Sequence, residues 1–154
     1  MPSDLDKFDL RILALLQEDA RLAAETIGAE VGLSASAVQR RIARLREDGA
    51  ISAEVAIVDA RRVGRPLCVI VDLEVKRERA ELLDELRRWI TAEAAIQQAW
   101  YVTGESDYVL IVTARDMEEY EALMQRLMAA NANVRRFRTR VALASVKRGM
   151  TLPL

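Results

Sequence analysis

Residues 33–45 read LSASAVQRRIARL and predict the helix that decides the fold of the first domain. Val38, Ile42 and Leu45 fall at i, i+4 and i+7, which places one apolar stripe on one helix face. The hydroxyl of Ser34 can accept a hydrogen bond from a free first-turn N–H, so Ser34 is a favourable N-cap. The other sides carry small or hydrogen-bonding residues that can enter a DNA major groove, namely Ser34, Ser36, Ala37, Gln39, Arg40, Arg41 and Arg44.

The segment just upstream supports this interpretation. Residues 24–31 predict a short helix that ends at Gly32, so the order is helix, tight turn, helix, which is the layout of a helix-turn-helix DNA reader. Gln and Arg make bidentate contacts to adenine and guanine edges. A solvated helix face is the alternative explanation for these polar residues. Arg41 can equally be structural, with its stem packed and its charge paired with a carboxylate.

The charge of the chain is nearly balanced. It has 154 residues and a formal net charge of −1, which excludes a globally basic coat for nucleic acid. The first fifty residues carry seven Lys or Arg against nine Asp or Glu, yet four of the seven cations lie between positions 40 and 46. A local cationic stripe on a neutral protein suits a selective reader better than a general binder.

Composition excludes several classes of site. The chain has no His, so His-based catalysis and His metal sites are excluded, and Cys68 is its only cysteine, which argues against a structural zinc. No phosphate-binding glycine loop occurs. We therefore expect no cofactor, no metal and no enzyme activity. We also expect no membrane partner and a cytoplasmic location, because no apolar run approaches the ~20 residues of a span and the first residues do not resemble a signal peptide.

The chain is predicted to form two domains. Residues 1–50 form the helix-turn-helix domain, of winged-helix-like type, with a first helix capped by Asp4 or Asp6. Residues 51–66 form a hinge strand and linker, in which residues 51–58 favour a strand and Pro66 disfavours helix before it. Residues 67–154 form the second domain.

The second domain changes its hydrophobic period. Its predicted elements follow in the order strand, helix, strand, strand, helix, strand. This is the α+β, ferredoxin-like βαββαβ arrangement. The predicted strands span 67–75, 96–103, 107–114 and 134–147, and the helices begin at 79 and after Asp116. Helices cover only one face of such a sheet. Apolar residues on both faces of the first strand therefore predict a second subunit as the other cover.

Taken together, these residues resemble the Lrp/AsnC, or feast/famine, family of transcription regulators. The resemblance rests on several motifs in the right order across nearly the whole chain. They are Leu5-Asp6-x-x-Asp9-x-x-Ile12-Leu13, Gly32-Leu33-Ser34, Arg41-Ile42-x-Arg44-Leu45, Gly49-x-Ile51, Thr103-Gly104-x-x-Asp107-Tyr108, Asp116-Met117, Val146-Lys147 and Leu152-Pro153-Leu154.

The resemblance implies dimers, often assembled into tetramers of dimers, and an amino-acid effector bound between dimers near the Thr-Gly-x-x-Asp turn. The residues it assigns to that effector are Thr103, Gly104, Glu105, Ser106, Asp107, Met117, Arg140, Val141 and Ala142. A carboxylate such as Asp107 can pair an ammonium group, and turn N–H groups can bind a carboxylate. Arg140 stands where the family commonly has an aromatic or apolar residue, which favours a polar or acidic effector. Glu105 and Asp107 can instead be ordinary turn acids.

The sequence thus predicts a sequence-specific regulator that binds double-stranded DNA and responds to a small molecule, with an amino acid as the expected effector. The alternative is an architectural protein that organises promoter DNA without an effector. An enzyme built on the ferredoxin-like half is disfavoured by the missing His, phosphate loop and metal cluster.

Overall fold

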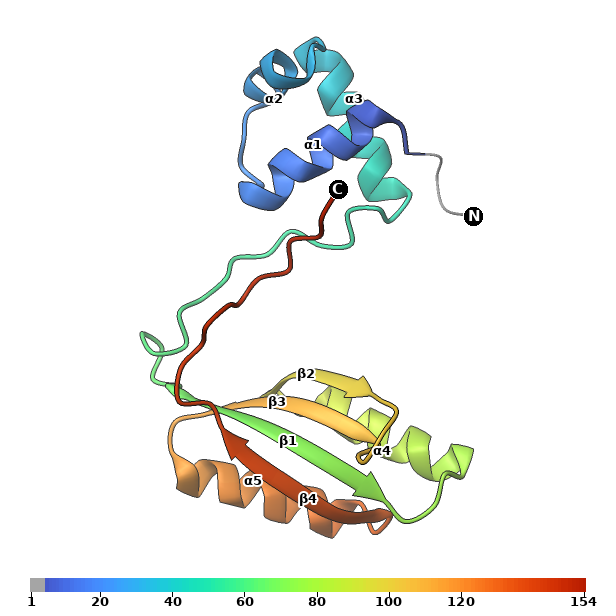
Figure 1. The fold of residues 1–154 in the computed structure, drawn as a ribbon, viewed down its shortest axis with the longest axis vertical. Helices are drawn as coiled ribbons and strands as arrows, with labels where there is room; N and C mark the ends of the chain where they lie inside the picture. The colour runs from blue at the N-terminus through green and yellow to red at the C-terminus, as the bar shows by residue number, and fades with distance from the viewer. Residues whose placement is uncertain (1–4) are drawn as a thin grey trace. The chain divides into compact units, whose positions relative to one another are not determined.

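A computed structural model describes residues 5–154 of the chain. The chain forms two compact units, of which one extends to Ile57 and includes Lys147–Leu154, and the other is Val58–Val146 (Figure 1). The division after Ile57 falls inside the segment predicted as a linker, whereas Lys147–Leu154, predicted as part of the second domain, belong to the first unit. The two units are described separately below.

The first unit contains three helices where three were predicted. They are α1 (Lys7–Glu18), α2 (Ala24–Val31) and α3 (Ala35–Glu47). Asp6 caps α1 by accepting from the N–H groups of Phe8 and Asp9, and Ser34 caps α3 by accepting from Ala37. Their apolar stripes meet in one small core, made of Ile12, Ile27, Val31, Val38, Ile42 and Leu45. The described residues of this unit contain no strand, so the helices stand without a wing.

Two glycines shape the turn between α2 and α3. Gly32 has a φ of 77°, a left-handed conformation that side chains rarely adopt, and it ends α2. Gly28 lies inside α2, where a Cβ would stand only 2.5 Å from the carbonyl oxygen of Leu33. The close approach of α2 to the turn therefore depends on the missing side chain at Gly28.

The strand predicted over residues 51–58 is wrong for this chain. The segment has no regular secondary structure, and most of it is exposed, including Val55 and Ile57. A strand needs hydrogen-bonding partners along its edge, and no neighbouring segment pairs with this one in the described residues. Apolar residues do alternate loosely along residues 51–58, but alternation alone does not supply a strand to pair with.

The second unit is a four-stranded antiparallel sheet with two helices, as predicted. Its elements are β1 (Leu67–Val75), α4 (Ala80–Ala92), β2 (Ile96–Tyr101), β3 (Tyr108–Ala114), α5 (Met117–Ala130) and β4 (Val134–Val141). The strand order is β2-β3-β1-β4, the ferredoxin-like order. The last strand is shorter than the predicted 134–147, because its ladder with β1 runs out near the start of β1, where Ala142 donates to Cys68.

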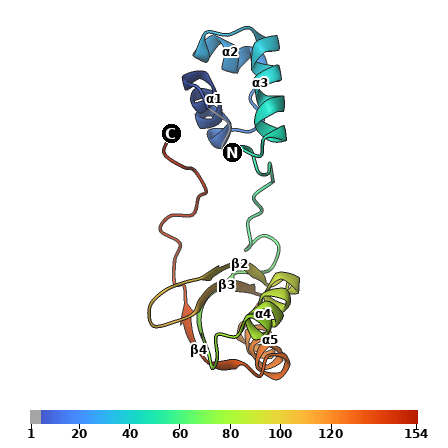
Figure 2. The ribbon, with the colours of Figure 1, turned by 90° about the vertical axis from the view of Figure 1, so that its right-hand side faces the viewer.

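Both helices lie on one face of the sheet (Figure 2). Alternate strand residues point toward them and are almost fully buried, among them Val69, Val71, Leu110 and Val112. No segment within residues 5–154 covers the opposite face, which we call the open face. It carries Ile70 of β1, Val109 and Ile111 of β3, Trp100 of β2 and Arg136, Arg138 and Arg140 of β4, as the strand register requires.

Within residues 5–154, none of the helices combines the length and the apolar character that a membrane span requires.

Candidate functional site

The exposed face of α3 presents a group of hydrogen-bonding side chains to solvent. Ser36, Gln39 and Arg40 are exposed, and Ala37 is half-buried. The Ser34 hydroxyl is engaged as the helix cap, accepting from the Ala37 N–H at 3.3 Å. Among the described residues, no hydrogen bond or ion pair engages the side chain of Gln39 or of Arg40, so both side chains are free to meet a ligand.

Arg41 is held inside its own unit. Its guanidinium donates to Asp6 and to Asp9, each at 2.8 Å, and lies 5.5 Å from the ring centroid of Phe8. Of the two roles predicted for Arg41, the structure shows the structural one. It joins the middle of α3 to the first turn of α1.

Arg44 shares the same carboxylate. Its guanidinium donates to the second oxygen of Asp9, and Asp9 is completely buried although it is charged. Each oxygen of this carboxylate therefore meets one arginine of α3. Arg44 was predicted to contact DNA, but its guanidinium is already engaged, which leaves Arg40 as the freer cation of the helix.

Sequence reasoning missed the role of Asp9. It is the third helical residue after the Asp6 cap, and its carboxylate also accepts from the Asp6 N–H at 3.2 Å, which completes a capping box. The Asp-x-x-Asp spacing signals this box. Nothing in the sequence indicates that two arginines more than thirty residues later converge on the same side chain.

The charges in this cluster shift one another. The pKa of Asp6 is lowered, first by the hydrogen bond from the Asp9 N–H and then by Arg41. The pKa of Arg41 is raised, first by its hydrogen bond to Asp9 and next by the one to Asp6. Both shifts favour the charged forms of these side chains. Ion pairs therefore connect the first turn of α1 to the middle of α3.

The predicted effector turn lies between β2 and β3. Gly104 has a φ of 117°, so this position requires a residue without a side chain. Thr103 and Glu105 are exposed, and Glu105 comes only within 3.8 Å of Arg138. Ser106 is half-buried. The exposed groups of the turn are available to a ligand.

Asp107 has a structural task in this turn. One carboxylate oxygen accepts from the Val75 N–H at 2.6 Å, and the backbone N–H of Asp107 donates to Leu73 at 2.9 Å. These bonds tie the turn to the end of β1. Asp107 therefore has the structural contact expected of an ordinary turn acid. No hydrogen bond within residues 5–154 engages its second carboxylate oxygen, so that oxygen can accept from other donors.

The remaining predicted effector residues lie at the other end of the sheet. The turn adjoins the Leu73 end of β1, whereas Val141 pairs with Val69 and Ala142 bonds to Cys68, near the start of β1. Met117, at the start of α5, follows the end of β3 that pairs with Leu67. At about 3.3 Å per residue along β1, the position opposite Arg140 lies about 10 Å from Leu73, and the end beside Met117 lies about 20 Å from it. One chain does not bring the predicted effector residues together.

Arg140 is paired inside the chain. It lies on the open face and donates to Asp72 at 2.7 Å, and Arg136 contacts Glu74 beside it at 2.6 Å. The preference for an acidic effector was based on a free Arg140. Asp72 already balances this charge, so the structure gives Arg140 no unpaired charge to favour a polar or acidic effector.

Comparison with known proteins identifies both units. A family model for the AsnC-type helix-turn-helix domain matches residues 5–46, and a model for the Lrp/AsnC ligand binding domain matches residues 68–152. An uncharacterized HTH-type transcriptional regulator of Sinorhizobium fredii is 40% identical over 98% of this chain and 89% of its own. The glutamate uptake regulatory protein of Zymomonas mobilis is 30% identical over 81% of this chain and 76% of its own.

Solved structures agree with the fold over nearly the whole chain. An AsnC family transcriptional regulator from Agrobacterium tumefaciens superimposes with a TM-score of 0.90 at 30% identity and covers 96% of each chain. A feast or famine regulatory protein from M. tuberculosis, complexed with L-methionine, has a TM-score of 0.82 at 27% identity, covering 94% of this chain and 95% of its own.

Proposed function

Because this chain belongs to the Lrp/AsnC family of transcription regulators, we propose that it reads an operator with the exposed face of α3 and that an amino acid controls it. Members of this family are DNA-binding regulators that respond to effectors, and they are not enzymes. Since its target is genomic DNA, we place the protein in the cytoplasm.

The exposed side chains of Gln39 and Arg40, which have no partner among the described residues, are the observation that carries the DNA proposal. Gln39 and Arg40 have the donors and acceptors that read adenine and guanine edges, and Ser36 can reach a phosphate or a base. Arg41 and Arg44 support them by fixing the helix through Asp9. The reading set predicted from sequence thereby divides into residues that contact DNA and residues that hold the helix in place.

Binding to an operator obtained by in vitro selection tests this division. We expect Arg40→Ala to weaken specific binding by about 1–3 kcal/mol, because it removes a base or phosphate contact. Arg21→Ala is the matched control, since Arg21 is an exposed arginine of the same unit outside α3. Fluorescence anisotropy at one fixed salt concentration measures both variants. Parental affinity for Arg40→Ala and Gln39→Ala would remove this face of α3 from the reading role.

The effector proposal rests on the chemistry of the 103–107 turn together with the relatives. The turn offers exposed groups beside an anion, Asp107, and a glycine that lets a ligand approach the backbone. One relative is named for glutamate uptake and a related structure contains L-methionine. Both facts support an amino acid as the effector class of this chain.

The separation of the two predicted effector groups supports an assembled site. Within one chain the turn adjoins the Leu73 end of β1, whereas Arg140 lies opposite the middle of β1 and Met117, Val141 and Ala142 lie toward its start. A complete pocket would therefore combine the turn of one subunit with the second group of another. We propose that the protein forms dimers through the open face and that dimers associate further to close this pocket.

A panel of amino acids scored by melting temperature tests the effector. A ligand that binds only the folded protein must raise its stability. We expect Asp107→Asn to reduce the affinity for the stabilising amino acid by about 1.5–3 kcal/mol, the worth of one charge-assisted hydrogen bond. DNA affinity without effector should stay at the parental value. The absence of any stabilising amino acid would favour the architectural alternative.

A further inference from the structure

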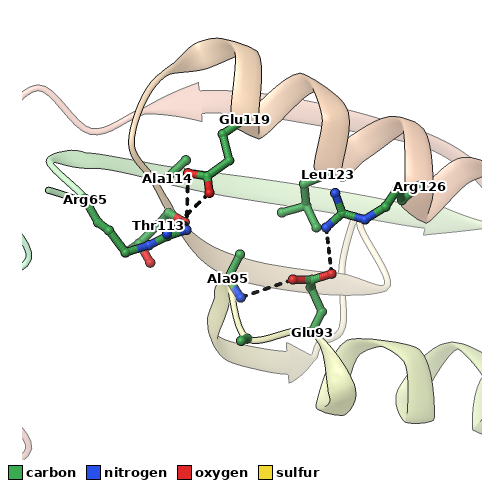
Figure 3. Close-up of a pocket in the computed structure, with 9 residues that line it drawn as sticks. Arg65, Glu93, Ala95, Thr113, Ala114, Glu119, Leu123 and Arg126 are labelled. Carbon is green, nitrogen blue, oxygen red and sulfur yellow. Dashed lines mark hydrogen bonds and ion pairs between the residues drawn. The ribbon is translucent and has the colours of Figure 1, made fainter. Parts of the chain in front are cut away.

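The Val58–Val146 unit contains a cavity of about 430 Å³ that is separate from the predicted effector turn. It lies where β3 ends, α5 begins and the chain enters β2 (Figure 3). The 103–107 turn precedes the opposite end of β3. A volume of this size falls within the range of small-molecule sites in proteins.

The bottom of the cavity is apolar. Leu123 and Ala114 line it and are almost completely buried. Ala94 and Ala95 add two methyl groups. Such a surface suits a small aliphatic or thioether side chain, because transfer of apolar area from water is favourable.

One side of the cavity is a loosely held ion pair. Arg126 of α5 donates to Glu93, which follows α4, at 2.9 Å (Figure 3). The Arg126 side chain is 56% exposed, and its guanidinium contacts Glu93 through this one bond among the described residues. The other oxygen of Glu93 accepts from the Ala95 N–H at 3.3 Å. Because the Arg126 end of this pair reaches solvent while Glu93 is only 20% exposed, a ligand that gives each group a new partner can open the pair at small cost.

The other side is a firmly held ion pair. Arg65 donates to Glu119 at 3.3 Å and to the carbonyl oxygen of Thr113 at 3.0 Å. Glu119 also accepts from the Arg115 N–H at 2.6 Å. Because each member has a further backbone partner, this pair forms a fixed wall and the Arg126–Glu93 pair is the one that can open.

We propose that this cavity is a second ligand site that takes an α-amino acid with an apolar side chain, with its carboxylate on Arg126 and its ammonium on Glu93. Two guanidinium groups and two carboxylates line the cavity, so its charge is balanced. A zwitterion entering between Arg126 and Glu93 re-pairs both groups, whereas a net anion or cation leaves one of them facing a like charge. The proposal extends the proposed amino-acid control to a different part of the same unit.

Titration calorimetry of the full-length chain with L-methionine and with L-leucine tests this site. We expect Arg126→Ala and Glu93→Gln each to weaken binding about tenfold or more, or to reduce the number of sites per chain from two to one. Arg135→Ala, an exposed arginine outside the cavity, is the matched control and should bind as the parent does. N-acetyl-L-methionine and L-methioninamide each lack one of the two charges and should bind the parent about tenfold more weakly or worse.

The same titrations separate this site from the turn. If Arg126→Ala and Glu93→Gln bind both amino acids with parental affinity and stoichiometry, the cavity is not the site and the inference is overturned. If Asp107→Asn binds as the parent does while the cavity variants lose binding, the cavity stands and the turn assignment fails. If the parent binds neither amino acid, the inference is overturned, whereas the proposed control by an amino acid is decided separately by the wider panel of melting temperatures.

Discussion

At the scale of single residues, the Asp9 carboxylate is the centre of the DNA-binding unit. It is fully buried, and it is tolerated there because Arg41, Arg44 and the Asp6 N–H meet its two oxygens. A buried charge without such partners would be costly. Three arginines were candidates for DNA contact, and these bonds already occupy the guanidinium groups of two of them, Arg41 and Arg44.

This arrangement predicts that two arginines one helical turn apart contribute differently to stability. Arg44→Ala should lower the free energy of unfolding of the first unit by about 1–2 kcal/mol, because one oxygen of a buried carboxylate loses its charged partner. Arg40→Ala should change stability by less than about 0.5 kcal/mol, since it has no partner to lose. Thermal melts compare the two variants. Equal stability would mean that the Arg44–Asp9 contact contributes nothing.

The lowered pKa of Asp6 predicts a dependence of stability on pH. Its folded pKa lies below the unfolded value of about 3.9, so the stabilisation is fully present above that value and is lost as the pH falls through the lower folded pKa. Melting temperatures of the parent should therefore fall more steeply below about pH 4 than those of Asp6→Asn. Glu47→Gln, a change at an exposed end of α3, serves as the control. Parallel curves for the parent and Asp6→Asn would contradict the assignment.

At the scale of elements, the contact of α2 with the following turn sets how α3 is presented. Gly28 permits the approach, and Gly32 reverses the chain with a positive φ. The Ser34 cap then starts α3 directly after the turn. The angle between α2 and α3 therefore depends on backbone packing in addition to the shared core.

A methyl group at position 28 should disturb this contact. In Gly28→Ala the new Cβ would stand 2.5 Å from the Leu33 carbonyl oxygen, so the backbone must shift. We expect a loss of about 1–3 kcal/mol in the stability of the first unit, despite the better helix propensity of alanine. Weaker operator binding should accompany it. Ala29→Gly, at an exposed position in the same helix, separates the steric effect from propensity. An unchanged or higher melting temperature for Gly28→Ala would show that the turn adapts.

At the scale of the whole molecule, the open face of the sheet requires explanation. Val109 and Ile111 are only half-buried there, and Trp100 is exposed. Asp72 and Glu74 are balanced by Arg140 and Arg136, so both of these carboxylates are already paired within the chain. An apolar strip with paired charges around it suits contact with a second copy of the same surface.

Assembly is therefore expected to depend on this face. We predict that the parent is at least a dimer at micromolar concentration and that Ile70→Asp shifts it toward the monomer, because an apolar contact would be replaced by a carboxylate that must lose its water in the interface. Val63→Asp changes an exposed apolar residue away from the sheet and is the control. Light scattering measures the mass, and circular dichroism checks that both variants fold. A parental mass for folded Ile70→Asp would exclude the open face as the interface.

Much of this protein is determined by the sequence alone, because its signals are local. The apolar stripe of Val38, Ile42 and Leu45, the Ser34 cap and the Gly32 stop each concern neighbouring residues, and all three were predicted correctly. The alternation of residues 67–75 likewise predicted β1 with its bounds. Family motifs spread along the chain identified the same two domains.

The tertiary structure decided what depends on residues far apart in sequence. Residues 51–58 alternate as a strand does, but no segment of the described chain pairs with them. The sequence suggests that Arg44 and Arg140 are unpaired cations, but the fold places Asp9 beside Arg44 and Asp72 beside Arg140. Periodicity reports which face of an element is buried, whereas a charge pair or a strand pairing depends on which distant group the fold places opposite. That placement follows from packing the whole chain.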